Sequence, residues 1–336
     1  MQYDVLEYDL SMETDNIHLL TFEPIYKERI WGGRNLERLF GRALPENVLI
    51  GESWELADLP EDKSVINVGP AKGKNIAELV RQWGISLLGD AKLDGGQFPL
   101  LIKLLDANDI LSVQVHPDYQ SAKEFGGNVR AKYEAWYVVD AQPDAFIYRG
   151  FKEGVTLEDV QSALEDNRLA EIMIKLPAKK GDFFYLPGGT VHALGKGLVV
   201  AEVQTPSDTT FRLYDWGRID KKTGKPRELH IEQALKSIRF YSQQDFMQST
   251  GLNVLVDAPT FRISKYQGQP EDRLEIKSGQ ACVWIIIAGN GLIEDKTVSV
   301  SLEAGKTILI PAALEDVRAT FQTHYEYLEV TLTGQK

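Results

Sequence analysis

The sequence predicts a mainly β protein, built as a sandwich or a barrel. Leu111–His116 alternates apolar and polar side chains without a break, which is the period of a half-buried strand. Short strand-like stretches then recur with Gly and Pro between them, at Asp182–Leu186, Leu198–Gln204 and Thr210–Tyr214. From Phe246 onwards the chain is almost wholly strand-like. Short strands with this rhythm are typical of all-β folds and not of alternating βαβ units.

Composition narrows the class of protein. A chain of 336 residues is long enough for more than one domain, and its net charge of −12 argues against nucleic acid or an anionic membrane as its partner. Its one cysteine, Cys282, excludes an intramolecular disulfide and is typical of a reducing compartment. The sequence shows neither a signal-peptide pattern nor a long apolar run that would span a bilayer. We therefore expect a cytoplasmic protein.

Helices are predicted at a few places only. Apolar residues at helical spacing indicate a helix over about 75–88, and a shorter one is expected over about 35–40 with Asn35 as its N-cap. Thr156 begins a capping-box pattern, so the acidic region of about 156–174 is expected to be a helical insertion. A short connecting helix is expected at Ile231–Ile238.

Two glycine-containing stretches are expected to form turns. Trp31-Gly32-Gly33 is one, and it has two interpretations: Trp31 faces a ligand that comes close to the glycine backbone, or it is simply buried. Lys221–Arg227, with the sequence KKTGKPR, is expected to be a solvated turn.

A weak internal repeat links the two halves of the chain. Lys180–Pro187 is echoed by Ala304–Pro311, and the strand around Trp136 is echoed by Cys282–Ile286. Such self-similarity indicates two copies of one structural unit.

Four side chains have the chemistry and the spacing of metal ligands: Gln114, His116, Glu134 and His192. The first two lie two positions apart on one strand and so face the same side. The third shares a strand face with Lys132 and Trp136, and the fourth follows a turn that contains Pro187 and Gly189. Imidazole and carboxylate groups suit Zn²⁺, and an amide oxygen is an acceptable partner.

The other histidines have no comparable context, and a lone histidine in a strand is more often a satisfied polar residue than a ligand. His18, His230 and His324 are therefore expected to be surface or packing residues. On the repeat, His192 corresponds to Asp316 and Glu134 to Cys282, so the second copy lacks the ligand set. We expect one metal site, in the first copy.

The motifs LSVQVHPD, KYEAW, GDFFYLPGGTVHAL and AEVQTPSDTTFRLYDWGR together resemble the class I, zinc-dependent mannose-6-phosphate isomerases in their short bacterial form. The match runs from about Phe22 to Arg218. It implies two cupin (jelly-roll) barrels with a helical insertion and N-terminal helices. Residues 1–235 would form the catalytic cupin domain, and 236–336 a second, metal-free one.

The resemblance also implies roles for individual residues. One Zn²⁺ per chain would be held by Gln114, His116, Glu134 and His192. Arg212 matches the essential active-site arginine of the family, while Ser112 and Lys132 match residues near the sugar phosphate. Arg218 stands where many relatives have a lysine, and we expect it in the substrate site together with Trp31.

The implied reaction interconverts mannose 6-phosphate and fructose 6-phosphate through a cis-enediolate. It needs a base at C2, and three candidates are open: Lys132, Glu202 and a metal-bound hydroxide. An arginine is a poor base because its pKa lies above about 12. Arg212 is therefore expected to act as a fixed positive charge beside the enediolate oxygen.

Two other functions are compatible with the scaffold. One is a different metal-dependent cupin enzyme, such as an iron dioxygenase, but such enzymes usually use two or three histidines without this Gln and Glu mixture. The other is a non-catalytic sugar-binding cupin, which the complete ligand set and Arg212 argue against. The expected partner is a small sugar phosphate, without nucleic acid or membrane, and the expected state is a monomer or weak homodimer.

Overall fold

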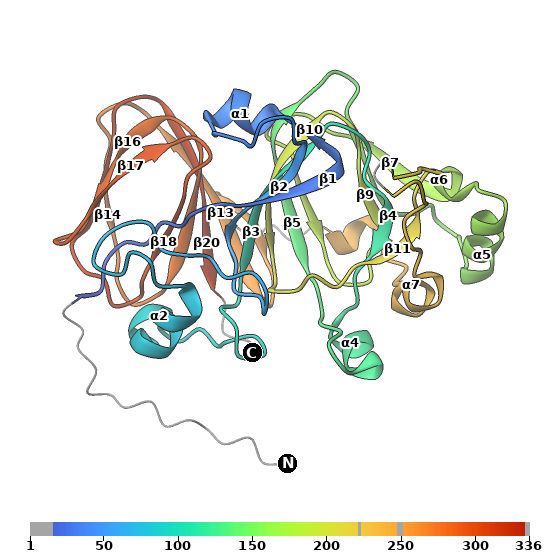
Figure 1. Cartoon of the computed structure of the whole chain (residues 1–336), viewed down its shortest axis with the longest axis horizontal. Coiled ribbons are helices and arrows are strands. Elements are labelled where there is room, and N and C mark those ends of the chain that lie inside the picture. Colours follow the sequence, from blue (N-terminus) through green and yellow to red (C-terminus); the bar gives the residue numbers. More distant parts are fainter. Residues whose placement is uncertain (1–15, 221–222, 247–250, 333–336) are drawn as a thin grey trace, which may run out of the picture. The chain divides into compact units, whose positions relative to one another are not determined.

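The computed structural model describes residues 16–220, 223–246 and 251–332, and its chain divides into two compact units (Figure 1). One unit comprises residues 24–59 and 100–257, and the other comprises residues 1–23, 60–99 and 258–336. Each contains antiparallel sheets. The prediction of a mainly β protein is confirmed.

The unit of residues 24–59 and 100–257 contains the predicted site, and we call it the site unit. Its larger sheet has, in order, β1 (Ile25–Gly33), β2 (Ile50–Leu56), β3 (Leu101–Ala107), β10 (Leu198–Gln204), β5 (Glu134–Ala141) and β8 (Phe183–Leu186). Its second sheet has β11 (Phe211–Tyr214), β4 (Val113–Val115), β9 (His192–Leu194), β6 (Phe146–Phe151) and β7 (Met173–Pro177). β12 (Val254–Asp257) ends the unit.

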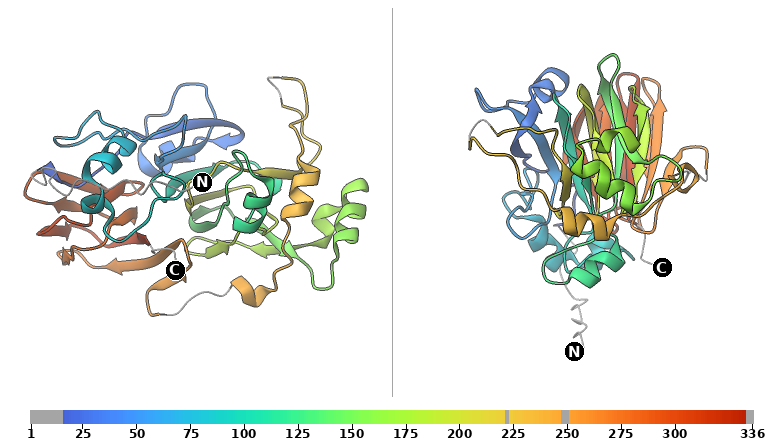
Figure 2. Two further views of the ribbon diagram at one scale, coloured as in Figure 1. Left: turned by 90° about the horizontal axis from the view of Figure 1, so that it is seen from below. Right: turned by 90° about the vertical axis from the view of Figure 1, so that its right-hand side faces the viewer.

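The two faces of the second sheet bury different partners. Ile147 and Leu194 face inward and share a core with Trp136 and Val200 of the larger sheet. The opposite face packs against α4 (Tyr119–Phe125), α5 (Leu157–Glu165), α6 (Leu169–Ile172) and α7 (Ile231–Ser237). Of these, α5 and α6, yellow-green in Figure 2, lie outside the sheet. The unit also contains α1 (Asn35–Phe40) and the 3₁₀ helix η2 (Gln243–Phe246).

The described residues of the other unit, which we call the second unit, form two sheets and two α-helices. One sheet contains, in order, β13 (Phe261–Gly268), β20 (Tyr325–Leu332), β15 (Cys282–Ala288) and β18 (Thr307–Ile310). The other runs β14 (Arg273–Ile276), β19 (Val317–Phe321), β16 (Asn290–Glu294) and β17 (Ser299–Glu303). The helices are α2 (Ile76–Trp83) and α3 (Ile85–Leu88).

The division into units differs from the expected boundary between residues 235 and 236. Residues 60–99 belong to the second unit, because the backbone N–H of Ala312 donates to Leu87 (3.0 Å) and Trp83 packs against the core around Trp284. Residues 236–257 stay with the site unit, where the Tyr241 hydroxyl donates to the carbonyl of Gly188 (2.9 Å). Packing of chain segments far apart in sequence decides both assignments.

The expected helices are present, with three corrections of detail. The Thr156 capping box exists, but α1 begins after Arg34, because Asn35 donates instead to Asp106 (2.6 and 2.9 Å). The helix expected over 75–88 breaks at Gly84, which has a φ of 46°. Helix α4 was not predicted, because it is mostly polar; Asp118 caps its first turn.

Two strand predictions also need correction. The stretch Leu111–His116 is regular only over β4, although its apolar side chains are buried as the alternation predicts. Trp31-Gly32-Gly33 is the end of β1 and not a turn. A Cβ on Gly32 would lie 2.5 Å from the backbone nitrogen of Gly51, so close packing of strands explains this glycine.

Candidate active site

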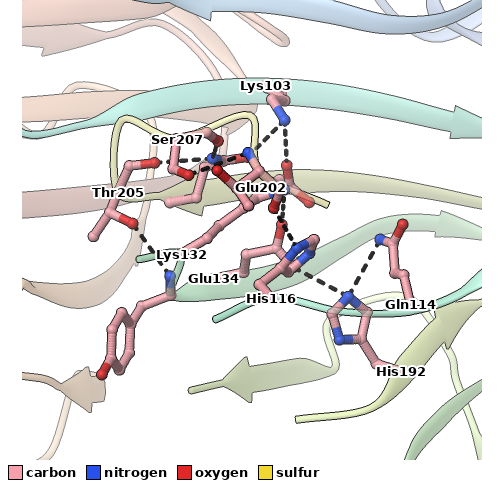
Figure 3. A network of polar contacts seen from close by, with 12 residues as sticks. Lys103, Gln114, His116, Lys132, Glu134, His192, Glu202, Thr205 and Ser207 are labelled. Carbon is pink, nitrogen blue, oxygen red and sulfur yellow. Dashed lines mark hydrogen bonds and ion pairs between the residues drawn. The ribbon is translucent and has the colours of Figure 1, made fainter. Parts of the chain in front are cut away.

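Both sheets of the site unit contribute to one cluster of potential ligands (Figure 3). Gln114 and His192 face each other across β4 and β9, and His116 directly follows β4. Glu134 begins β5 in the other sheet. Its Oε2 lies 3.4 Å from Nε2 of His116 and 3.3 Å from Nε2 of His192. The ligand atoms of these three residues lie within 4.8 Å of one another, so they form a group that could hold a metal ion.

Backbone carbonyls orient both imidazoles. Nδ1 of His116 lies 2.9 Å from the carbonyl oxygen of Thr209, and Nδ1 of His192 lies 2.9 Å from that of Thr190. A carbonyl only accepts, so each Nδ1 carries the proton and each Nε2 keeps its lone pair. Both lone pairs point toward Glu134, as ligand imidazoles require.

The protonation states fit a cation. Burial lowers the pKa of His116 to about 3, and the ammonium of Lys132 adds to this effect, so the imidazole is neutral. Burial alone would raise the pKa of Glu134, but the ammonium of Lys132 acts against it, and the pKa lies well below its usual range. Two imidazoles and one carboxylate are a donor set typical of zinc.

Buried polar atoms without a hydrogen-bond partner provide a second test of whether these residues fit a metal ion. Nε2 of His116 and Oε2 of Glu134 are fully buried and have no hydrogen-bond partner. A buried polar atom without a partner costs free energy, on the order of 1–3 kcal/mol. A bound cation would satisfy both atoms at once.

The fourth expected ligand is next to the same group. The amide nitrogen of Gln114 lies 3.3 Å from Nε2 of His192. A half-turn about the last side-chain bond exchanges the amide nitrogen and oxygen, which would present the oxygen to a cation. Arg212, on β11, faces Gln114 in register and so lies on the same face of the sheet.

A cavity of about 410 Å³ adjoins this group, within the usual size of a small-molecule site. Each of three buried carboxylates that line it has a cation: Lys132 pairs with Glu134 (2.7 Å), Lys103 with Glu202 (3.0 Å) and Arg29 with Glu52 (2.7 Å). Paired charges of this kind tolerate burial because each partner offsets the desolvation of the other.

The environment separates the pKa values of these acids. Burial raises the pKa of Glu202, and the nearby charge of Glu134 raises it further against the effect of Lys103. For Glu52, burial also acts upward, but Lys103 and Arg29 dominate and lower the pKa to about 2. Divergent carboxyl pKa values in one cavity are typical of sites that move protons.

Most of the predicted site residues meet in this cavity. Those that line it are Trp31, Ser112, Gln114, Lys132, Glu134, Glu202 and Arg212. Trp31 is nevertheless only 4% exposed and packs in the core. Arg218 does not line the cavity, because its guanidinium pairs with Asp215 and donates to the carbonyl of Ile110.

Sequence reasoning missed three cations of the cavity: Arg29, Lys103 and Arg227. Arg227 belongs to the stretch expected to be a solvated turn, of which residues 221–222 lie outside the described residues. It lines the cavity and its side chain is only 19% exposed, so that expectation was wrong for it. Lys103 lines the cavity from β3. A single lysine inside the apolar run PLLIKLL was the available signal, since buried charges need a partner.

The other histidines behave as packing or surface residues, as expected. Nδ1 of His230 accepts a hydrogen bond from the backbone of Arg212 (3.2 Å). His18 is buried and accepts at Nε2 from the backbone of Ala71 (3.1 Å), while His324 is exposed.

The fold and the site together define a class: mainly β proteins of cupin-like architecture with a buried His–Glu–His group at the wall of a charged cavity. Residues 19–146 match the sequence model of the family described as "Phosphomannose isomerase type I, catalytic domain". A mannose-6-phosphate isomerase from Streptococcus mutans is 35% identical over 304 residues, which cover 87% of this chain and 94% of that protein. The chain therefore belongs to the type I phosphomannose isomerase family.

Solved structures agree with this membership. The crystal structure of the mannose 6-phosphate isomerase from Bacillus subtilis matches with a TM-score of 0.83 and 28% identity, over 94% of this chain and 99% of that one. A mannose 6-phosphate isomerase bound with zinc and yttrium matches with a TM-score of 0.71, over 94% and 99%. At 16% identity the second likeness concerns the fold alone.

The helices within the described ranges include no candidate for a membrane-spanning segment. None of the helices there is both long enough and apolar enough to cross a bilayer.

Proposed function

We propose that this chain is an aldose–ketose isomerase that interconverts mannose 6-phosphate and fructose 6-phosphate. Family membership supports this activity, and one observation carries it: the buried group of His116, Glu134 and His192 opens onto a cavity lined by Lys132, Glu202 and Arg212. An isomerase of this kind needs a proton carrier and fixed positive charge beside the sugar oxygens.

Zinc is the proposed cofactor, one ion per chain, held by Gln114, His116, Glu134 and His192. The orphaned Nε2 and Oε2 atoms and the neutral state of His116 support it. When bound, zinc would supply Lewis acidity at the oxygens on C1 and C2 of the sugar. The fold neighbour bound with zinc agrees with this choice of metal.

Two buried side chains are the proposed carriers of the proton between C2 and C1. Lys132 donates to Glu134 Oε1 (2.7 Å), and a charged lysine can act as a base only after it loses a proton. Glu202 accepts from Nε1 of Trp136 (2.7 Å) and pairs with Lys103, so its orientation is fixed while it remains an acceptor. Burial raises its pKa, which makes its carboxylate a stronger base. Glu202 is therefore our preferred base.

Arg212 is the proposed electrostatic group. Its Nε donates to the hydroxyl of Ser112 (3.3 Å) and its Nη1 to the carbonyl of Glu228 (2.7 Å), which fixes the guanidinium. A guanidinium keeps its charge throughout the reaction and so stabilises an enediolate oxygen without exchanging protons with it.

The test is turnover of mannose 6-phosphate in an assay coupled to fructose 6-phosphate formation. We expect activity that is lost on chelation and restored by zinc. Absence of turnover in the zinc-loaded protein, with sugar phosphate still bound, would indicate a non-catalytic sugar-binding protein. Restoration by iron alone, with oxygen consumed, would indicate a different metal-dependent enzyme.

Two further expectations are part of the proposal. A cytoplasmic location is supported by the single, free and buried Cys282. A monomer or weak homodimer in solution is the proposed state, and light scattering across a concentration series measures it.

A further inference from the structure

Two arginines share the carboxylate of Asp215, and the charge of a third, Arg212, lies close enough to interact with all three groups. Arg218 and Arg227 both contact Oδ1 of Asp215, and Nε of Arg227 also donates to its Oδ2 (2.8 Å). Arg212 pairs with no carboxylate in the part of the chain that the structure describes. We call Arg212, Arg218, Arg227 and Asp215 the arginine cluster.

The cluster carries excess positive charge. Asp215 is the carboxylate that Arg218 and Arg227 share, and Oδ2 of Asp109 lies 3.9 Å from Nη1 of Arg218, so three guanidinium groups face two carboxylates. Asp220, which also lines the cavity, accepts a hydrogen bond at Oδ1 from the backbone of Thr223 (3.2 Å). Burial lowers the pKa of Arg212, and the neighbouring charge of Arg227 lowers it further. Like charges held this close are stabilised by an anion.

The two arginines that share Asp215 differ in what they face. Arg227 lines the cavity, as do Arg212, Ser112 and Thr210. Arg218 turns its Nη1 to the carbonyl of Ile110 and stays outside the cavity. The guanidinium N–H groups of Arg218 bind Asp215 and the loop before β4.

We infer that Arg227, together with the hydroxyls of Ser112 and Thr210, binds the phosphate of the substrate, whereas Arg218 positions Asp215. The inference rests on the proposed function and deepens it, because it assigns phosphate binding to an arginine outside the recognised motifs. Guanidinium forks match phosphate oxygens in pairs, which a single lysine cannot do.

The experiment compares two matched variants, Arg227→Gln and Arg218→Gln, since each leaves Asp215 with one arginine. A charge-assisted hydrogen bond contributes about 1.5–3 kcal/mol, so Arg227→Gln should raise the KM for mannose 6-phosphate by about 10- to 100-fold with little change in kcat. The inhibition constant of inorganic phosphate should rise in parallel. Inhibition by mannitol, which lacks a phosphate, should not change.

Arg218→Gln should lower the melting temperature, and because Arg218 acts on the phosphate only through Asp215, both phosphate-dependent constants should rise much less than in Arg227→Gln, by about threefold. Arg227→Lys keeps the charge and loses the fork, so it should lie between wild type and Arg227→Gln. If Arg227→Gln does not fold, Arg227→Lys provides the measurement instead.

Unchanged phosphate inhibition in the Arg227 variants, with normal wild-type turnover, would overturn the inference and leave the isomerase proposal intact. A wild-type protein without turnover would overturn the isomerase proposal instead. Calorimetric titration of inorganic phosphate into wild type and Arg227→Gln would still decide the role of Arg227 in that case, because it requires no catalysis.

Discussion

The site unit and the second unit each contain an equivalent pair of strands, and the side chains on the two pairs differ. β5 and β10 of the site unit place Trp136 opposite Glu202, and β15 and β20 of the second unit place Trp284 opposite Glu329. In both, the indole Nε1 donates to the carboxylate, at 2.7 and 3.0 Å. Both pairings also skip one residue three positions after the tryptophan, Val139 in β5 and Ile287 in β15. The predicted repeat is thus visible in register and in contacts.

The polar side chains around this equivalent pair of strands differ between the two units. Cys282 stands where the site unit has Glu134, and Ser264, opposite Glu329, stands where it has Lys103 opposite Glu202. Asp316, the counterpart of His192, is exposed and pairs with Lys296 (2.8 Å).

Aromatic rings occupy the interior of the second unit. The ring of Tyr327 stacks on Trp284 with centroids 4.1 Å apart, at the strand position that holds Val200 in the site unit. Phe321 and Tyr325 stack beside it at 3.7 Å. The two units therefore differ at a few polar positions, while the same strand framework surrounds a polar site in one unit and stacked aromatic rings in the other.

The largest difference between the two units should appear when the matched positions Glu134 and Cys282 are substituted. Glu134→Gln removes the anionic ligand and leaves Lys132 buried beside a neutral amide, so metal affinity should fall at least about 100-fold and turnover with it. Cys282→Ala should leave turnover unchanged and cost only about 1 kcal/mol of stability. Metal content after dialysis and turnover measure both. Zinc retained by Glu134→Gln would contradict the assignment.

Arg212→Ala should lower kcat by about 100- to 1000-fold, the usual loss when a fixed electrostatic group is removed from a reacting centre. Metal content should be unchanged, because Arg212 is not one of the ligands. Arg262→Ala is the control in the second unit, where the arginine is exposed and faces Thr331. Equal losses in both variants would argue against a catalytic role.

Acid should destabilise the site unit through Glu52. Its pKa is lowered from 4.5 to about 2, so its ionised form stabilises the fold fully above pH 4.5, and this contribution disappears as the pH falls toward 2. The shift corresponds to about 3 kcal/mol. Chemical unfolding of metal-free protein should show this slope in wild type and not in Glu52→Gln. An identical slope in both would refute the prediction.

The second unit should show a smaller effect of opposite sign through Glu329. Burial raises its pKa, so the folded state binds the proton more tightly than the unfolded chain does. Stability should therefore fall as the pH rises from 4.5 through the folded-state pKa. Glu329→Gln, whose amide oxygen still accepts from Trp284, should lose this dependence. Melting curves of both proteins across this range provide the comparison.

Local patterns predicted much of the fold because they act between near neighbours. Alternation placed the buried side chains of β4, and the Thr156 pattern located the start of α5. The ligand candidates were visible because His and Glu are conspicuous in apolar strands. Arg227 was not visible, because a basic turn looks solvated until Asp215, twelve positions earlier, folds against it.

The sequence by itself determined the mainly β class, the four ligand candidates and the repeat, since each depends on side-chain type and spacing along one strand or turn. Only the tertiary structure decided that residues 60–99 pack with the second unit, that Lys103 faces Glu202 and that Arg227 replaces Arg218 at the cavity. The physical reason is that a buried charge must find its partner in space, and that partner lies on a strand or loop distant in the chain.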